Sequence, residues 1–133
     1  MRLSVLTKEA DQVESSNHAT TRLIVKSRSA YVFLTPSEIV RIEALDRVTQ
    51  IHTRTEAFET RTSIGSLEQI LPADTFVRIS RSHIINLDYV RMVEHWFRGQ
   101  YRFFLNDGHF ILGSRRYRDR IRRVLDPASQ DID

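Results

Sequence analysis

The sequence predicts a mainly β domain with one short central helix and a C-terminal helix. Short runs of alternating apolar residues, separated by polar turns, recur along most of the 133 residues. Apolar residues return at helical spacing in two stretches, 63–71 and 114–125. The length corresponds to one domain, and 41% hydrophobic with 28% charged residues is typical of a globular protein.

The first half of the chain contains a leader and a series of short strands. Residues 1–20 are polar and aperiodic, and we expect a flexible leader there. The predicted strands are 21–26, 31–34, 39–45, 48–53 and 57–62. In the third of them Val40, Ile42 and Ala44 should share one face, because strand side chains alternate. Asp46-Arg47 forms the turn that follows.

The central helix is expected over 63–71, where Ile64, Leu67 and Leu71 recur at helical spacing. Ser63 can act as its N-cap, since a serine hydroxyl accepts a hydrogen bond from an unpaired amide of the first turn. Pro72 ends the helix because proline lacks a donor and restricts the residue before it. We expect this helix to be structural.

The second half begins with residues 76–86, where an alternating strand is interrupted by Ser80-Arg81-Ser82 and then resumes. Strands at 90–97, 100–105 and 109–113 follow, and Asn106-Asp107-Gly108 indicates a hairpin. The last helix spans 114–125, and residues 126–133 are expected to be an acidic, disordered tail. The apolar stripe of that helix consists of Tyr117, Ile121, Val124 and Leu125.

The polar corner Ser80-Arg81-Ser82 is the first candidate site. Three polar residues between two apolar segments cannot all lie in a core, so the corner would present Arg81 from a buried support. The alternative is a solvated loop with an ordinary surface arginine.

The charge of the second half of the chain supports the first interpretation. Residues 74–125 contain eleven arginines, no lysine and five acidic residues, a net charge of +6. Arginine suits bidentate contacts with phosphates and guanine edges, although a GC-rich genome would also enrich it.

Composition and spacing argue against several classes of protein. The chain has no cysteine, its five histidines lack metal-ligand spacing, and no glycine loop for phosphate is present, so we expect no metal and no cofactor. Ser82-His83 is not a catalytic dyad because adjacent strand residues point to opposite faces. We therefore expect no enzyme activity. No apolar run is long enough for a membrane span, and a cytoplasmic location is expected.

The aromatic residues of the predicted last hairpin leave two interpretations. They could stack single-stranded bases, as aromatic platforms do in many nucleic-acid-binding domains. We favour a hairpin core, which is the commoner use of such a cluster. The residues concerned are Trp96, Phe97, Tyr101, Phe103, Phe104 and Phe110.

Three sequence motifs in order resemble one known family. The first comprises Phe76, Arg78, Arg81-Ser82, Ile84-Ile85 and Asn86-Leu87. The second is the Asp107-Gly108 turn, an apolar strand and Ser114-Arg115-Arg116-Tyr117, and the third is the segment from Ile39 to Glu43-Ala44 with its polar turn. Together they resemble the LytTR family of bacterial DNA-binding domains over roughly residues 21–125. The resemblance implies an antiparallel β scaffold that contacts DNA mainly through loops.

The resemblance also implies the contact residues. Arg81 and Arg116 align with family contact positions, and the third contact lies at Thr49 with Arg47 as its neighbour. Arg115 lies beside the N-terminus of the last helix, where free amides and the helix dipole favour a phosphate. Ser80 occupies a position where many members have histidine.

Two further residues of the motif have open or structural roles. Arg78 is either a phosphate contact or a solvated strand residue. Asn86 is interpreted as a buried amide that ties down the corner, rather than as a residue that contacts bases.

The sequence therefore predicts a sequence-specific transcription regulator that binds double-stranded DNA, often as a homodimer on repeated sites by analogy with the family. A signalling partner would supply its input. The alternatives are an RNA- or single-strand-binding β domain and a β-rich protein-interaction module whose arginines meet an acidic partner.

Overall fold

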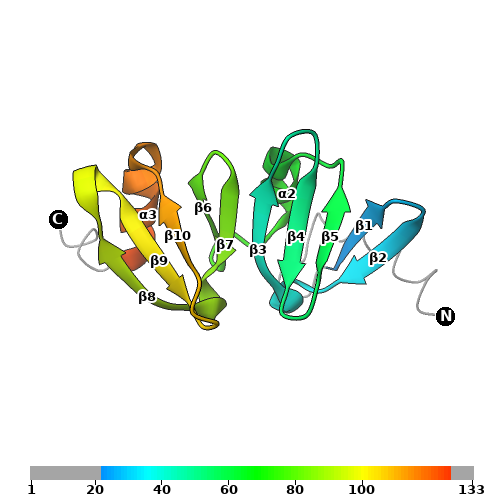
Figure 1. The fold of residues 1–133 in the computed structure, drawn as a ribbon, viewed down its shortest axis with the longest axis horizontal. Coiled ribbons are helices and arrows are strands. Elements are labelled where there is room, and N and C mark those ends of the chain that lie inside the picture. The colour runs from blue at the N-terminus through cyan, green and yellow to red at the C-terminus, as the bar shows by residue number, and fades with distance from the viewer. Residues whose placement is uncertain (1–21, 127–133) are drawn as a thin grey trace.

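The computed structural model describes residues 22–126, which form ten strands and two α-helices (Figure 1). The predicted leader and the rest of the acidic tail after Asp126 lie outside the described residues. The strands are β1 Leu23–Ser27, β2 Ala30–Leu34, β3 Ile39–Ala44, β4 Thr49–Thr53, β5 Ala57–Thr60, β6 Phe76–Ser80, β7 His83–Asn86, β8 Val90–His95, β9 Tyr101–Leu105 and β10 Phe110–Gly113. The α-helices are α2 Ile64–Ile70 and α3 Arg118–Leu125, and short 3-10 turns are η1 Pro36–Glu38, η2 Leu87–Tyr89, η3 Phe97–Gly99 and η4 Arg115–Tyr117.

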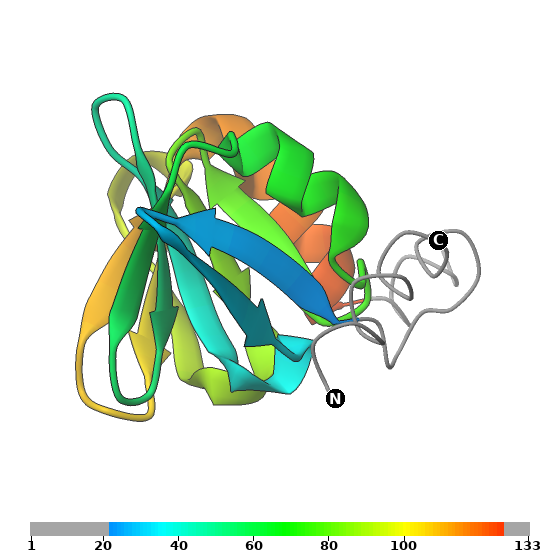
Figure 2. The same ribbon diagram turned by 90° about the vertical axis from the view of Figure 1, so that its right-hand side faces the viewer.

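The strands form three antiparallel sheets that follow one another along the long axis of the molecule (Figure 1). Their orders are β1-β2, β5-β4-β3-β7-β6 and β10-β9-β8. Both helices lie on the same side of the strands (Figure 2). The mainly β, antiparallel architecture with a short central helix and a C-terminal helix is confirmed.

Two hydrophobic cores share the hairpin of β6 and β7. The first core contains Phe76 and Ile84 from this hairpin, together with residues of α2 and of β1 to β4. The second contains Val77, Ile79 and Ile85, together with residues of β9 and α3. Because the hairpin is anchored in both cores, the polar corner at its tip has a rigid base.

One expectation for β3 is wrong. Val40 belongs to the second core, whereas Ile42 belongs to the first and Ala44 packs against it. The pairing of β3 with β4 shifts register between Ile39 and Arg41. Such a bulge interrupts the alternation of side chains, so Val40 does not share a face with Ile42.

The two helices differ in how closely they follow the prediction. Ser63 caps α2 as expected, and its Oγ accepts a hydrogen bond from the Ser66 amide at 3.1 Å. The last helix begins later than expected, because η4 occupies its predicted first turn. Ile121 is 1% exposed, but Leu125 is 44% exposed, so the predicted stripe packs only through its earlier residues.

The aromatic residues are divided between two faces of β9. Tyr101 and Phe103 belong to the second core, as expected. Trp96, Phe104 and Phe110 instead surround Arg102, whose guanidinium carbon lies 3.7 Å from the Trp96 ring centre. Strand alternation explains the division, since neighbours of a core residue point outward. Phe97, which is 63% exposed, lies in η3 and not in the core.

Candidate nucleic-acid interface

Six turns of the molecule lie along one edge; five of them are at the top of Figure 1, and the β1–β2 turn lies lower, at the right-hand end. They are β1–β2, β3–β4, β5–α2, β6–β7, β8–β9 and β10–α3. Antiparallel pairing produces this arrangement, because every second turn returns to the same edge of a sheet. The exposed arginines of these turns, here called the basic edge, are Arg28, Arg47, Arg61, Arg81, Arg98, Arg115 and Arg116.

The opposite edge has the opposite charge. Its turns and short 3-10 segments contain Glu38, Glu56, Asp74, Asp88 and Asp107, all exposed, against one arginine, Arg54. The basic edge contains one acidic turn residue, Asp46. No arginine of the basic edge forms an ion pair with another residue of the described range 22–126. The molecule thus has one edge whose cations are available to an anionic partner.

Three of these arginines have left-handed backbone conformations. Arg28, Arg47 and Arg98 have φ angles of 60°, 72° and 59°, and they are the three residues other than glycine with positive φ in the described part of the chain. An L-residue in this region costs about 1–2 kcal/mol, which glycine avoids. Each lies in a turn of the basic edge. The use of arginine where glycine would be less strained favours a role for these side chains.

Arg78 holds the corner from below. Its Nε donates to the Ser80 carbonyl at 2.9 Å and its Nη2 to the Arg81 carbonyl at 2.8 Å. Its Nη1 donates to Glu68 Oε1 at 2.8 Å, and Glu68 also accepts a bond from Arg120 of α3 at 2.9 Å. The side chain is 14% exposed. The interpretation of Arg78 as a solvated strand residue is therefore wrong, because it ties the corner to α2 and α3.

The corner is closed by its own hydroxyl groups. The half-buried Ser80 accepts a bond from the Ser82 amide at 3.2 Å, and Ser82 Oγ lies 3.3 Å from His83 Nδ1. Ser80 is thus part of the frame of the turn. Arg81, at the tip, is exposed and has no side-chain partner among the described residues.

Asn86 is a buried structural amide, as predicted, but it fixes the other end of the hairpin and not the corner. It is 0% exposed, its amide donates to the Ile39 carbonyl at 2.8 Å, and its oxygen accepts from the Asp88 amide at 2.8 Å. A residue buried in this way has no exposed polar atom to offer a base.

The two other predicted contact turns are bonded directly to this hairpin. The Ala44 amide donates to the Ser82 carbonyl at 2.8 Å, which joins the β3–β4 turn to the corner. The Ser114 amide donates to the Ile79 carbonyl at 2.8 Å, which joins η4 to β6. The structure therefore brings together three segments that lie far apart in the sequence.

The structure corrects one of the predicted contacts. Thr49 is 4% exposed, since its position in β4 faces the interior. Its side chain is not available to DNA in this conformation. Arg47, two residues earlier at the tip of the turn, is exposed.

Arg115 and Arg116 lie in η4, ahead of α3, and both are exposed. The β8–β9 turn packs beside them at Gly99, whose φ is 79°. A Cβ atom at Gly99 would lie 2.7 Å from Arg118 Nη1 and 3.3 Å from Arg115 Cγ. This close approach places the Arg98 turn next to η4, so the basic edge continues past the predicted contact at Arg116.

A histidine cluster lies behind the corner. Glu43 Oε1 is 3.2 Å from Arg41 Nη1 and 3.4 Å from His52 Nε2, and Glu43 Oε2 is 3.8 Å from His83 Nε2. Burial lowers the pKa of both histidines, aided by the Arg41 charge and opposed by Glu43. Both imidazoles are therefore neutral near pH 7.

Sequence reasoning missed Arg28, Arg61, Arg98 and the bracing role of Glu68. Arg28 and Arg98 were visible as turn residues, but only the strand pairing shows that their turns share an edge with Arg81. Within residues 22–126, no group of three or more His, Asp or Glu side chains is arranged so that it could hold a metal ion. Neither helix of that range has the length and apolar character needed to cross a membrane.

Comparison with known proteins bears on the fold and the family of the chain. A profile of the LytTr DNA-binding domain matches residues 29–126. The solved LytTr DNA-binding domain of a Bacillus cereus protein superposes with a TM-score of 0.71 at 21% identity, over 78% of this chain and 95% of that one. At this identity the likeness shows the fold.

Curated relatives are longer proteins. Sensory transduction protein LytT of Bacillus subtilis is 24% identical over 115 residues, which are 86% of this chain and 48% of the relative. Transcriptional regulatory protein LytR of Staphylococcus aureus is 33% identical over 75 residues, 56% of this chain and 30% of the relative. The chain thus spans less than half of each relative. With the profile match, the fold and the motifs in agreement, the chain belongs to the LytTr DNA-binding domain family.

Proposed function

We propose that this chain binds double-stranded DNA in a sequence-specific manner through the turns of its basic edge, as the DNA-contacting part of a transcription regulator. The observation that supports this most directly is the direct bonding of the β3–β4 turn and η4 to the β6–β7 hairpin. Three arginine-bearing turns held in fixed relation can contact successive parts of a duplex, whereas isolated flexible arginines would give only non-specific attraction.

The roles of the individual residues follow from their exposure and from the hydrogen bonds that hold their turns. Arg81 is exposed on a braced corner, so we assign it a base contact, for which a guanidinium fork matches a guanine edge. Arg116 is assigned a second contact, with Arg115 beside it for phosphate. Arg47 replaces Thr49 as the third. Ser80 and Arg78 are assigned to positioning the corner.

A signalling partner is part of the proposed function. Relatives named as sensory transduction proteins suggest an input from a signalling partner. Binding as a pair on repeated sites is also part of the proposal, and we expect a cytoplasmic location because the partner is genomic DNA.

Selection of bound sequences from a randomised duplex pool, at about physiological salt, tests the proposal. Recovery of a defined motif is expected, and a repeated motif would support binding as a pair. Log affinity should fall against log salt with a slope of roughly −4 to −5, for about five neutralised phosphates. If the protein retained duplexes that share no motif, sequence specificity would be refuted. A slope of log affinity against log salt near zero would refute DNA binding.

Arg81→Ala and Arg116→Ala then test the site, with Arg54→Ala on the opposite edge as the matched control. Each of the first two should weaken binding to the selected motif by about 1–3 kcal/mol and relax specificity at one position. The control should bind as the unchanged protein does. Equal binding by all three variants would show that the contacts lie elsewhere.

One observation bears on single-stranded nucleic acid. Phe104 and Phe110 lie on the outer face of the three-stranded sheet, but their rings already contact Arg102, which also pairs with Glu94. We therefore favour duplex DNA. Competition between duplex and single-stranded oligonucleotides of the same sequence separates the two, and no retention of either would favour the protein-interaction alternative.

A further inference from the structure

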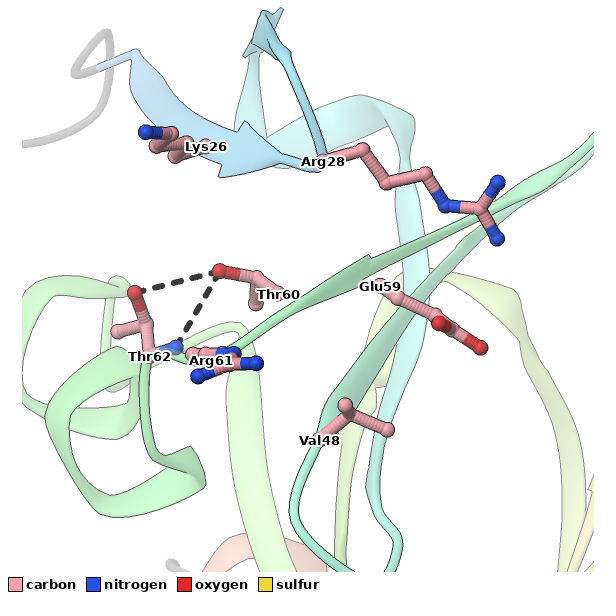
Figure 3. Close-up of a pocket in the computed structure, with 7 residues that line it drawn as sticks. All are labelled: Lys26, Arg28, Val48, Glu59, Thr60, Arg61 and Thr62. Atoms are coloured by element: carbon pink, nitrogen blue, oxygen red, sulfur yellow. Dashed lines mark hydrogen bonds between the residues drawn. The ribbon is translucent and has the colours of Figure 1, made fainter.

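A groove lies at the β1–β2 end of the basic edge, next to the β3–β4 contact turn, whose Val48 lines it. Its volume is about 780 Å³, and Figure 3 shows its residues around the space between β1 and β5. They come from the strands β1 and β5 and from three turns of the basic edge, β1–β2, β3–β4 and β5–α2. The lining residues are Lys26, Arg28, Val48, Glu59, Thr60, Arg61 and Thr62.

The groove has a net positive charge. Lys26, Arg28 and Arg61 line it with one carboxylate, Glu59, which gives a net charge of +2. All three cationic side chains are exposed, and none forms an ion pair with another described residue. Three unpaired cations around one concavity attract a multivalent anion more strongly than a single cation does.

The floor of the groove offers a hydrogen-bond donor. The buried Thr60 hydroxyl accepts from the Thr62 amide at 3.2 Å and donates to the Thr62 hydroxyl at 3.3 Å (Figure 3). The exposed Thr62 hydroxyl therefore acts as acceptor within the pair. Its own proton remains available to a phosphate oxygen.

The position of the groove indicates its partner. Val48 lines it, and the neighbouring residue Arg47 is one of the three proposed contacts. A duplex that meets Arg47 would thus continue directly over the groove. Lys26 and Arg28 lie before the segment matched by the family profile, which begins at residue 29, so the family match does not assign them a role.

We propose that this groove binds the phosphate backbone of the same duplex, beyond the bases contacted by the β3–β4 turn. The inference rests on the proposed function, because it requires the basic edge to face DNA. Lys26, Arg28 and Arg61 supply the charge, and Thr62 donates a hydrogen bond. Such contacts position the domain and lengthen its footprint without contributing base specificity.

The test uses the full chain and the variant Lys26→Gln/Arg28→Asn/Arg61→Gln. Asparagine is chosen at Arg28 because it tolerates the φ of 60°. Arg54→Gln is the matched control, since Arg54 is an exposed arginine on the opposite edge. Thermal unfolding checks the fold of each protein, and the single variant Arg61→Gln replaces the triple variant if the latter is unstable.

Affinity is measured on one half-site of the selected motif and on duplexes shortened stepwise from either end. The triple variant should lose roughly tenfold to a hundredfold in affinity on all sequences alike, with a salt slope less steep by about 2 to 3. Shortening one particular end should weaken binding by the unchanged protein and by Arg54→Gln. It should have no such effect on the triple variant, which has already lost those contacts.

Three outcomes would overturn the inference. The triple variant could bind the full-length duplex as tightly as the unchanged protein, or it could lose the same factor when that end is removed. In both cases the proposed function would still stand if Arg81→Ala bound the selected duplex more weakly than the unchanged protein. If the unchanged protein bound no duplex at all, the proposed function would fail, and this inference with it.

Discussion

Replacement of Arg78 tests whether the corner is held rigidly for contact with DNA. Arg78→Met keeps an unbranched side chain that can fill the same apolar path but removes all five N–H donors. In the structure those donors serve the Ser80 and Arg81 carbonyls and Glu68.

The expected loss in the free energy of unfolding depends on which bonding partners each acceptor keeps in the variant. A hydrogen bond involving a charged group contributes about 1.5–3 kcal/mol where water is excluded, and less where water can replace it. The Arg81 carbonyl is in an exposed turn and can be hydrated, and Glu68 keeps its pair with Arg120 at 2.9 Å. We therefore expect the free energy of unfolding to fall by about 2–3 kcal/mol, well below the sum of three full bonds.

Urea denaturation measures the stability, and titration with the selected duplex measures binding. Arg78→Lys is the informative control. Lysine keeps the positive charge but lacks the planar guanidinium that donates to three acceptors at once. If Arg78 positions Arg81, both variants should weaken binding and relax specificity where Arg81 contacts a base. If Arg78 instead contacts phosphate, only the methionine variant should make the salt slope less steep, by about 1.

Two results would refute this reasoning. A stability loss below about 0.5 kcal/mol in Arg78→Met would place it among ordinary surface substitutions and show that the three bonds are not structural. Full stability and full affinity in Arg78→Lys would show that charge, and not the geometry of the fork, is what the corner requires.

Three further perturbations have defined outcomes. Asn86→Leu should reduce the free energy of unfolding by about 2–4 kcal/mol, because it leaves the buried Ile39 carbonyl without its donor; a loss under 1 kcal/mol by chemical denaturation would contradict this role. Ile121→Ala should cost about 2–5 kcal/mol and loosen α3, and unchanged hydrogen exchange of that helix would argue against its dependence on this contact. Lowering the pH below 6.5 should destabilise the fold, because the pKa values of His52 and His83 are lowered in the folded state and the unfolded chain takes up protons first. That stability is present above pH 6.5, and His52→Gln/His83→Gln should flatten the dependence, as followed by urea midpoints between pH 7.5 and 5.

The local elements were predictable where short-range chemistry decides them. Ser63 as N-cap, Pro72 as terminator and the Asn106-Asp107-Gly108 hairpin depend on neighbouring residues, and all three occur in the structure. The bulge that separates Val40 from Ile42 was not predictable, because it depends on the pairing of β3 with β4. The burial of Thr49 was likewise decided by packing.

The candidate site was predictable in part for the same reason. Arg81 and Arg116 were found because each lies in a local motif with a recognisable sequence. Arg28 and Arg98 have no such motif, and a turn arginine looks the same in sequence whichever edge it occupies. The bond from Arg78 to Glu68 also required the fold, since Glu68 is ten residues earlier and is itself held by Arg120 of the last helix.

The sequence by itself determined the fold class, the order of the elements, the family and the polar corner, since these depend on periodicity, turn chemistry and local motifs. Only the tertiary structure decided which turns share an edge, because strand pairing joins residues far apart in the chain. It placed the unpaired arginines on one edge and the acidic turns on the other. It also gave Arg78 its partners, because hydrogen bonds between separate elements exist only once the two cores have packed.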